Sequence, residues 1–305
     1  MSIGRPMTID YDDAARLVRL CILARKPIIP EDHLPDGVDL LLDLNVRPDD
    51  SGSGIDIDAR GSLFEDRDRH RLILCFRGVD DWNDVYHFWR PGLTEFRDCL
   101  CHGGTLVQYI GLAPPLMIAI RKRIEEGGID AVMCTGGSGG GAMALLAALD
   151  LTEQGLGVAI ALRSFGSPKV FVRSAVDQVT KRLTDICRFV HVRDPVPHWP
   201  LTADAVDLIA DEPIPPRLSA ALGNIGNQYT HVGRCVVFHG ERAVVGEGAA
   251  PIESGASLLS MLVGVTDTHF LPRYLERIEG QLESTASRLH SSCWLSGVLS
   301  TMMGP

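Results

Sequence analysis

The sequence lacks the features that mark several common classes of protein. Basic residues number 29 against 39 acidic ones, a formal net charge of −10, and there is no basic block or stripe. Nucleic acid and anionic membrane surfaces are therefore poor candidate partners. Since no window approaches about 18 consecutive apolar residues, we expect no transmembrane helix. The first twenty residues carry acids ahead of the apolar stretch and no small-residue cleavage site, unlike a secretory signal.

Cysteine pairs at metal-ligand spacing are also missing. None of the eight cysteines forms a C-x-x-C pair, and several lie inside apolar runs, where a free thiol behaves as a small hydrophobic group. Cys99, Cys101 and His102 form a short cluster with no second half at zinc spacing. We therefore expect no metal and no organic cofactor, and a reducing, cytoplasmic environment, with non-classical export left open.

What is present is the composition of an ordinary globular chain. Its 305 residues are 45% hydrophobic and 22% charged, which suits one large or two small domains. No internal repeat or linker interrupts it. We expect a single domain over residues 1–305, with residues 283–305 as a loosely packed C-terminal tail; the oligomeric state stays open.

Short apolar runs alternate with helical patterns along the chain. This alternation predicts an α/β fold with a mostly parallel central sheet and helices on both faces. Residues 28–60 are rich in Pro, Asp and Gly, and SGSG at 51–54 is expected to be an exposed loop. The expected strands are 72–76, 130–135, 157–165, 186–192 and a hairpin over 235–245 that turns at His239–Gly240. The expected helices are 11–25, 105–125 interrupted at Pro114–Pro115, 142–151, 172–183 and 267–282.

A glycine cluster between an expected strand and an expected helix has two interpretations. Gly137, Gly139 and Ala142 fit the dinucleotide fingerprint G-x-G-x-x-A. That fingerprint requires an acid at the end of the next strand to hold a ribose, and here the strand ends in Arg163-Ser164-Phe165. The nucleotide-binding interpretation is therefore weak.

The same cluster contains G-x-S-x-G at Gly136, Ser138 and Gly140. A nucleophile elbow needs a sharp strand-to-helix turn, and the flanking glycines keep side chains from colliding across it. The serine of such a turn lies at a helix N-terminus, where backbone N–H groups favour developing negative charge. This pattern predicts a catalytic serine.

An acid and a histidine follow the serine in the order that α/β-hydrolases use. Asp194 comes directly after an expected strand, and His269 opens the last expected helix. Both can reach the carboxyl edge of the sheet, where Ser138 is expected. His231 is followed by a β run and His198 is too close to Asp194 in sequence, so both are weaker candidates for the base.

Several ordered stretches make the sequence resemble the class 3 (fungal-type) lipases of the α/β-hydrolase superfamily, over roughly residues 10–280. They are 75–78 (CFRG, family FRGT) with 81–84 (DWND), 102–104 (HGG) with Tyr109, 135–142 (TGGSGGGA, family TGHSLGGA), 164–170 (SFGSPKV, family TFGSPRVG), 194–197 (DPVP, family DxVP), 229–233 (YTHVG, family YxHxG), and His269 with Tyr274 (family DHxxY, here with looser spacing).

The resemblance implies a serine carboxylic-ester hydrolase, a lipase or esterase, with an α/β-hydrolase fold. It implies Ser138 as nucleophile, His269 as base and Asp194 as the acid that orients it. The backbone N–H groups of Val79 and Gly139 are expected to form the oxyanion hole. The family usually has Thr or Ser where this chain has Val79. A phospholipase, an effector-type lipid hydrolase and a catalytically silent interaction module remain alternatives.

Directly after Val79, four large residues recur at helical spacing. Trp82, Val85, Tyr86 and Trp89 fall at i, i+3, i+4 and i+7. This pattern is typical of an ordinary core face, and its position beside the expected oxyanion donor equally suits a lid that opens at a lipid–water interface.

Overall fold

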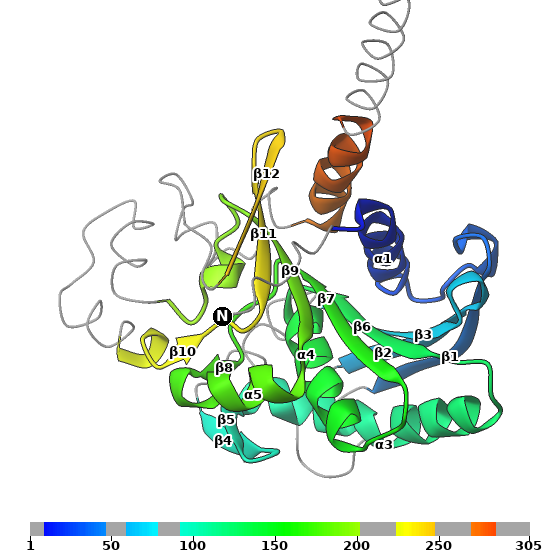
Figure 1. Cartoon of the computed structure of the whole chain (residues 1–305), viewed down its shortest axis with the longest axis horizontal. Coiled ribbons are helices and arrows are strands. Elements are labelled where there is room, and N and C mark those ends of the chain that lie inside the picture. Colours follow the sequence, from blue (N-terminus) through cyan, green and yellow to red (C-terminus); the bar gives the residue numbers. More distant parts are fainter. Residues whose placement is uncertain (1–8, 47–58, 79–91, 202–223, 248–269, 285–305) are drawn as a thin grey trace, which may run out of the picture.

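A computed structural model describes residues 9–46, 59–78, 92–201, 224–247 and 270–284 (Figure 1). Its centre is a sheet with the strand order β1-β2-β3-β6-β7-β9-β11-β12. The five inner strands β3, β6, β7, β9 and β11 are parallel, and the two strands at one edge and one at the other are antiparallel. The strands are β1 (Val38–Val46), β2 (Ala59–Asp66), β3 (Arg71–Phe76), β6 (Ala131–Gly137), β7 (Ala159–Phe165), β9 (Asp185–His191), β11 (Arg234–His239) and β12 (Arg242–Glu247). The predicted fold class is confirmed.

Helices cover both faces of this sheet (Figure 1). On one face α3 (Gly103–Glu125), α4 (Gly139–Glu153) and α5 (Val176–Arg182) enclose the larger hydrophobic core. On the other face α1 (Tyr11–Leu23) and a helix over residues 271–284 enclose a second core. Since both faces are covered, the inner strands are apolar on both sides, as in β3, where all six residues are buried.

A second, four-stranded antiparallel sheet lies beside the first, in the order β10-β8-β5-β4. Its strands are β4 (Leu93–Phe96), β5 (Cys99–His102), β8 (Phe171–Val172) and β10 (Tyr229–Thr230). Short 3₁₀ helices complete the described elements: η1 (Glu31–His33), η3 (Arg67–Arg69), η4 (Arg173–Ala175) and η5 (Val196–His198).

A buried ion network fixes α1 against the sheet. Asp10 caps α1, since its side chain accepts from the Asp13 backbone N–H at 2.9 Å. Arg71, at the start of β3, donates to Asp13 at 2.9 Å and to Asp66 at 3.0 Å, and all three are buried. The guanidinium thus bridges two carboxylates, so that each buried charge is paired.

The structure differs from the sequence-based expectation in several elements. The Pro-, Asp- and Gly-rich stretch 28–60, where no strand was expected, contains β1, whose residues alternate between more and less buried positions; the expected loop at 51–54 lies outside the described residues. The helix α3 continues through Pro114 and Pro115, which are both exposed, so water can bind the backbone carbonyls that lose their helical partners. The helix expected over 172–183 is shorter, because residues 171–172 form β8 and α5 begins at Val176.

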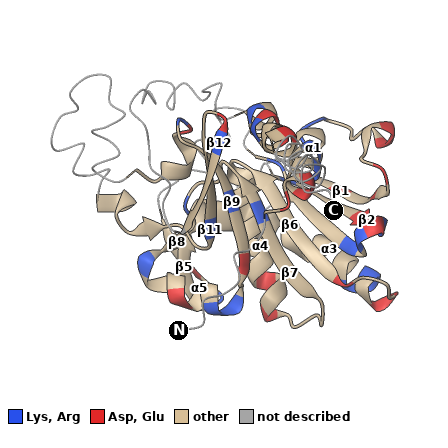
Figure 2. Ribbon diagram, turned by 45° about the horizontal axis from the view of Figure 1, so that its top comes forward, with Lys and Arg blue, Asp and Glu red and all other residues tan. Residues whose placement is uncertain are grey.

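Charged residues lie on the outer surfaces of the layers. Figure 2 shows blue and red segments interspersed around α1 and the ends of α3, whereas the inner strands are mostly tan. The same α3 is long and apolar enough to cross a membrane by length and composition, but half of its most apolar window is buried in the fold. The core helix of a globular protein can have the same length and apolar composition.

Candidate active site

Ser138 occupies the sharp turn between β6 and α4. Its backbone has φ 54° and ψ −133°, a conformation that L residues rarely adopt and that costs about 1–3 kcal/mol. The Ser138 N–H donates to the Phe165 carbonyl at 2.9 Å, and the Ser138 carbonyl accepts from the Gly141 N–H at 3.0 Å. Ser138 is also the N-cap of α4 and is half-buried. The strained conformation is the one that a nucleophile elbow requires.

We call residues 136–141 the nucleophile turn, and its glycines are there because side chains do not fit. A Cβ on Gly136 would be 2.4 Å from the Gly140 carbonyl carbon, and a Cβ on Gly140 would be 2.2 Å from the Phe76 carbonyl oxygen. Both obstacles are backbone atoms that cannot rotate away. The G-x-S-x-G pattern therefore follows from contact between β6, the first turn of α4 and the end of β3.

Asp194 lies beyond the carboxyl end of β9 and is completely buried. One of its carboxylate oxygens, Oδ1, accepts from the Val196 N–H at 3.0 Å. The other, Oδ2, accepts from the Tyr274 hydroxyl at 2.6 Å. Two hydrogen bonds from different directions fix the plane of this carboxylate. We call residues 194–201 the Asp194 loop.

Tyr274 is the functional residue to which sequence analysis assigned no role. Its hydroxyl donates to Asp194 and accepts from the His191 N–H at 3.2 Å, joining the helix over 271–284 to β9 and the Asp194 loop. Burial, and then the neighbouring Asp194 carboxylate, raise the pKa of Tyr274 well above its usual value, so this hydroxyl keeps its proton. The sequence contains a signal for this role, because Tyr274 comes shortly after His269, as a tyrosine does in the family segment DHxxY.

His269 lies outside the described residues, but the residues that follow it are described. Leu271 opens the last helix and packs against the nucleophile turn: a Cβ on Gly137 would be 2.5 Å from the Leu271 Cδ2 atom. One turn later Tyr274 binds Asp194. The described chain next to His269 therefore contacts both the nucleophile turn and the acid.

The proposed oxyanion donors are divided between described and undescribed residues. Gly139 is the first residue of α4 and is buried. Val79 lies outside the described residues, as do Trp82, Val85, Tyr86 and Trp89. Gly78, directly before Val79, is packed against the nucleophile: a Cβ there would be 3.0 Å from the Ser138 Cβ.

Four of the described histidines are buried: His102, His191, His198 and His231. The Nε2 atom of His231 lies 2.6 Å from the Pro197 carbonyl oxygen, and burial lowers its pKa well below the usual value. Burial lowers the pKa of both His198 and His102 to about 4. The His102 Nδ1 accepts from the Thr105 N–H at 3.2 Å, which caps α3.

Within the described residues no group of His, Cys, Asp or Glu side chains has the arrangement of a metal site. Cys99 and Cys101, next to His102 in sequence, are buried and contact other groups. The Cys99 thiol lies 3.6 Å from a Gln178 side-chain oxygen, and the Cys101 thiol lies 3.4 Å from the Thr94 carbonyl oxygen.

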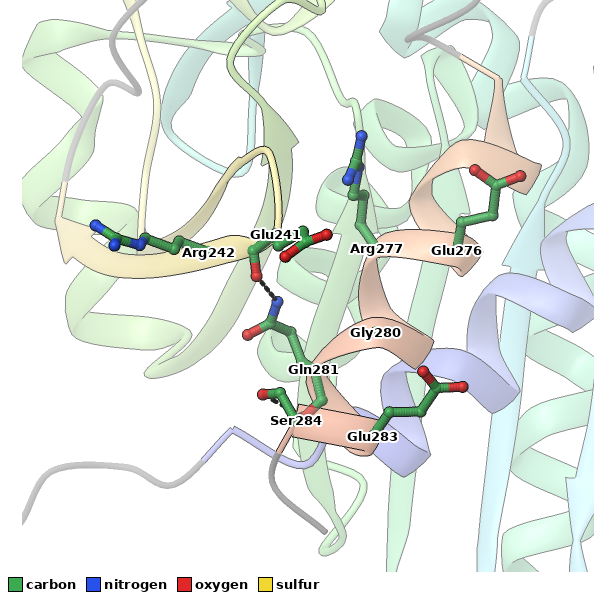
Figure 3. Close-up of a pocket in the computed structure, with 8 residues that line it drawn as sticks. All are labelled: Glu241, Arg242, Glu276, Arg277, Gly280, Gln281, Glu283 and Ser284. Atoms are coloured by element: carbon green, nitrogen blue, oxygen red, sulfur yellow. Dashed lines mark hydrogen bonds between the residues drawn. The ribbon is translucent and has the colours of Figure 1, made fainter. Parts of the chain in front are cut away.

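An open groove of about 590 Å³ lies between the β11–β12 hairpin and the last helix (Figure 3). The Gln281 Nε2 donates to the Glu241 carbonyl across it at 2.7 Å. Its lining is Glu241, Arg242, Glu276, Arg277, Gly280, Gln281, Glu283 and Ser284. The lining carries both signs of charge. It contains none of the proposed catalytic residues, so the groove is separate from the site at Ser138.

The sheet order and the nucleophile turn define an α/β-hydrolase. Residues 73–203 match the family model described as "Lipase (class 3)", a span that includes both Ser138 and Asp194. The resemblance to class 3 lipases is thereby confirmed.

Individual proteins of this kind are similar to the chain. The secreted mono- and diacylglycerol lipase A of Penicillium cyclopium is 28% identical over 149 residues, 47% of this chain and 48% of that protein. The chain thus matches about half the length of this curated relative.

Two solved structures share the fold. The Rhizomucor miehei lipase propeptide complex superposes with a TM-score of 0.62 at 18% identity, covering 83% of this chain and 78% of that one. A fungal lipase–inhibitor complex, described as a model for interfacial activation in lipases, has a TM-score of 0.61 at 18% identity, covering 85% and 92%.

Proposed function

We propose that this protein is a serine carboxylic-ester hydrolase, a lipase or esterase that acts on acylglycerols or simple fatty-acyl esters. The observation that carries the proposal is Ser138, held at φ 54° at the N-terminus of α4. The hydrogen bonds described for this turn use backbone groups and not the hydroxyl, whereas a nucleophile needs this strained position at a helix N-terminus. The similarity to lipases over residues 73–203 supports the same reaction.

The reaction follows from three residues in named roles. The Ser138 Oγ attacks the ester carbonyl carbon while His269 takes its proton, and Asp194 stabilises the imidazolium. The tetrahedral intermediate collapses, His269 gives the proton to the departing alcohol, and the acyl group stays on Ser138. Water then attacks with His269 as base, which releases the carboxylic acid and restores the serine.

His269 as the base is supported by its two anchored neighbours in sequence. Leu271 packs on Gly137, next to the nucleophile, and Tyr274 binds Asp194. A histidine two residues before Leu271 is close along the chain to both of these contacts. His231, the competitor, has its Nε2 committed to the Pro197 carbonyl.

For the oxyanion hole we propose the N–H groups of Val79 and Gly139. Gly139 directly follows the nucleophile and begins α4, so its N–H belongs to the unpaired first turn of a helix. Gly78 packs against Ser138, which brings the chain before Val79 to the same side of the serine. A preorganised pair of donors is worth about 10²–10³ in rate for each donor.

The direct test is hydrolysis of p-nitrophenyl esters of graded acyl length by the wild type and by Ser138→Ala. We expect turnover by the wild type and a loss on the order of 10⁴-fold or more in the variant, because no other group replaces the nucleophile. Equal rates for the two purified, folded proteins would refute the hydrolase.

Further measurements on the wild type and Ser138→Ala separate the alternatives. Release of fatty acid from phosphatidylcholine in preference to acylglycerols would favour a phospholipase, and toxicity on expression that disappears in Ser138→Ala would favour an effector. A catalytically silent interaction module predicts no turnover on any ester. The serine and acid described here favour the enzyme, since a silent module needs neither.

We also propose that Trp82, Val85, Tyr86 and Trp89 form the apolar face of a lid. Their helical spacing and their place directly after Val79 support this, as does the interfacial activation described for the fungal lipase–inhibitor complex. The rate on a short-chain triglyceride should then rise sharply as its concentration passes the solubility limit. A plain hyperbolic curve would make the stripe ordinary core and the enzyme an esterase.

A further inference from the structure

Lys169 is a buried ammonium group to which the proposed mechanism gives no role. It lies between the end of β7 and β8, and its side chain is inside the fold, with an exposed fraction of 7%. Burying a charged amine is unfavourable unless it makes a specific interaction. Packing alone would be satisfied by a methionine of similar length.

The interactions of Lys169 converge on the segment that follows the catalytic acid. Its backbone N–H donates to the Trp199 carbonyl at 2.9 Å. Its Nζ donates to the Pro200 carbonyl at 2.8 Å. One residue therefore holds two successive carbonyls of the Asp194 loop, one through its backbone and one through its charge.

The residues just before Lys169 contact the nucleophile turn. The Phe165 carbonyl accepts from the Ser138 N–H at 2.9 Å. The Ser167 Cβ lies 2.8 Å from the position that a Cβ on Gly141 would take. Residues 165–169 thus form a five-residue bridge between the nucleophile and the acid.

We propose that Lys169 is a positioning residue, which holds the Asp194 loop at a set distance from the nucleophile turn. This inference rests on the proposed serine hydrolase mechanism. The ammonium does not contact the ester; it acts through the Pro200 carbonyl on the loop that carries Asp194. Its loss should lower the rate of the chemical step and leave substrate binding nearly unchanged.

The surroundings make this anchor dependent on pH. The charged or titratable groups that interact with the ammonium are Arg173, His198 and His231, and these two histidines in turn interact with Arg188 and, for His198, with Asp194. Burial, reinforced by Arg173, lowers the pKa of Lys169 to about 8. The two histidines are already neutral there, because burial lowers the pKa of His198 to about 4 and the pKa of His231 well below its usual value, and the arginines keep their charge. As the pH rises through about 8, Lys169 therefore loses its proton, and the bond to Pro200 loses its charge.

The test compares Lys169→Met, Lys169→Arg and a surface control, Lys181→Met on α5, using p-nitrophenyl butyrate across pH 6–10. We expect kcat to fall about 10- to 100-fold in Lys169→Met with KM within about twofold, since tenfold corresponds to about 1.4 kcal/mol of lost orientation. Lys169→Arg should recover kcat to within about threefold. The decline of wild-type kcat above pH 8 should be absent in Lys169→Arg, because a guanidinium does not titrate.

Three results would overturn the proposal: a folded Lys169→Met with wild-type kcat, a loss that appears in KM alone, or the same alkaline decline in Lys169→Arg as in the wild type. If Lys169→Met does not fold, the alkaline comparison between wild type and Lys169→Arg decides. Hydrogen exchange of residues 194–201 should be faster in Lys169→Met. If the wild type hydrolyses no ester but exchange of residues 194–201 is still faster in Lys169→Met, the proposed reaction is refuted and the positioning role of Lys169 stands.

Discussion

The nucleophile turn and the Asp194 loop supply the two described members of the proposed triad by opposite means. Ser138 is placed by backbone contacts and by the absence of side chains at Gly136 and Gly140. Asp194 is placed by side chains: the Tyr274 hydroxyl holds its carboxylate, and the Lys169 ammonium holds its loop. The first arrangement rests on backbone packed against backbone, including the end of β3, whereas the second rests on two side chains from other parts of the chain.

The difference predicts different responses to mutation. In the nucleophile turn an added atom has no room, so substitutions should act on folding. In the Asp194 loop a removed atom leaves the packing nearly intact, so substitutions should act on orientation and hence on rate. Each prediction below tests or refines that contrast.

The largest effect is expected at His269, the proposed base. His269→Ala should lower kcat by on the order of 10⁴-fold, as expected for loss of a triad member. His231→Ala is the matched control, because His231 is buried and holds the Pro197 carbonyl. It should lower the thermal midpoint and keep kcat within about tenfold. An active His269→Ala beside a folded, inactive His231→Ala would reverse the assignment of the base.

Gly140→Ala should prevent folding or cost about 3 kcal/mol or more in the free energy of unfolding. The new Cβ would be 2.2 Å from the Phe76 carbonyl oxygen, and backbone on both sides must shift to admit it. Gly246→Ala in β12 is the control, because no atom of the described residues lies within 4 Å of its Cβ position. Urea denaturation followed by circular dichroism measures both. A Gly140→Ala protein as stable as Gly246→Ala would contradict the packing argument.

Tyr274→Phe should lower kcat about tenfold, since one of the two described hydrogen bonds that orient Asp194 is lost. The structure offers a close control in Tyr109, which is also buried and donates to the buried carboxylate of Asp150 at the same 2.6 Å. Both phenylalanine variants should lose about 1–3 kcal/mol of stability. Only Tyr274→Phe should lose turnover, and an equal kcat in the two variants would make the tyrosine purely structural.

The smallest expected effect is an increase in kcat. Val79→Thr should raise kcat several-fold, because a hydroxyl at this position can donate a further hydrogen bond to the oxyanion, and one such donor is worth about 10²–10³ in favourable geometry. Steady-state kinetics on p-nitrophenyl butyrate measure it, with Val79→Ala as the control for lost bulk. A rate that stays level or falls in Val79→Thr would mean that valine already fits the site.

Much of the fold could be predicted from the sequence because its signals are local. The inner strands were recognisable as continuous apolar runs, and the β11–β12 hairpin from its Gly240 turn, where φ is 56°. β1 was missed, because the Pro- and Gly-rich residues around it concealed its alternation. The continuity of α3 through Pro114 and Pro115 could not be predicted, since it depends on which side of the helix is exposed.

The sequence by itself indicated the proposed nucleophile, because glycines on both sides of a serine between a strand and a helix permit the sharp turn that the structure shows at Ser138. Only the tertiary structure decided how the acid is held. Tyr274 lies 80 residues from Asp194 along the chain, and Lys169 lies 31 residues from the carbonyl it binds. Neither contact follows from residue type or spacing, because a buried hydroxyl or ammonium can find its partner on any element that packs against it. The packing of the last helix against the sheet, and the course of the chain between β7 and β8, select those partners.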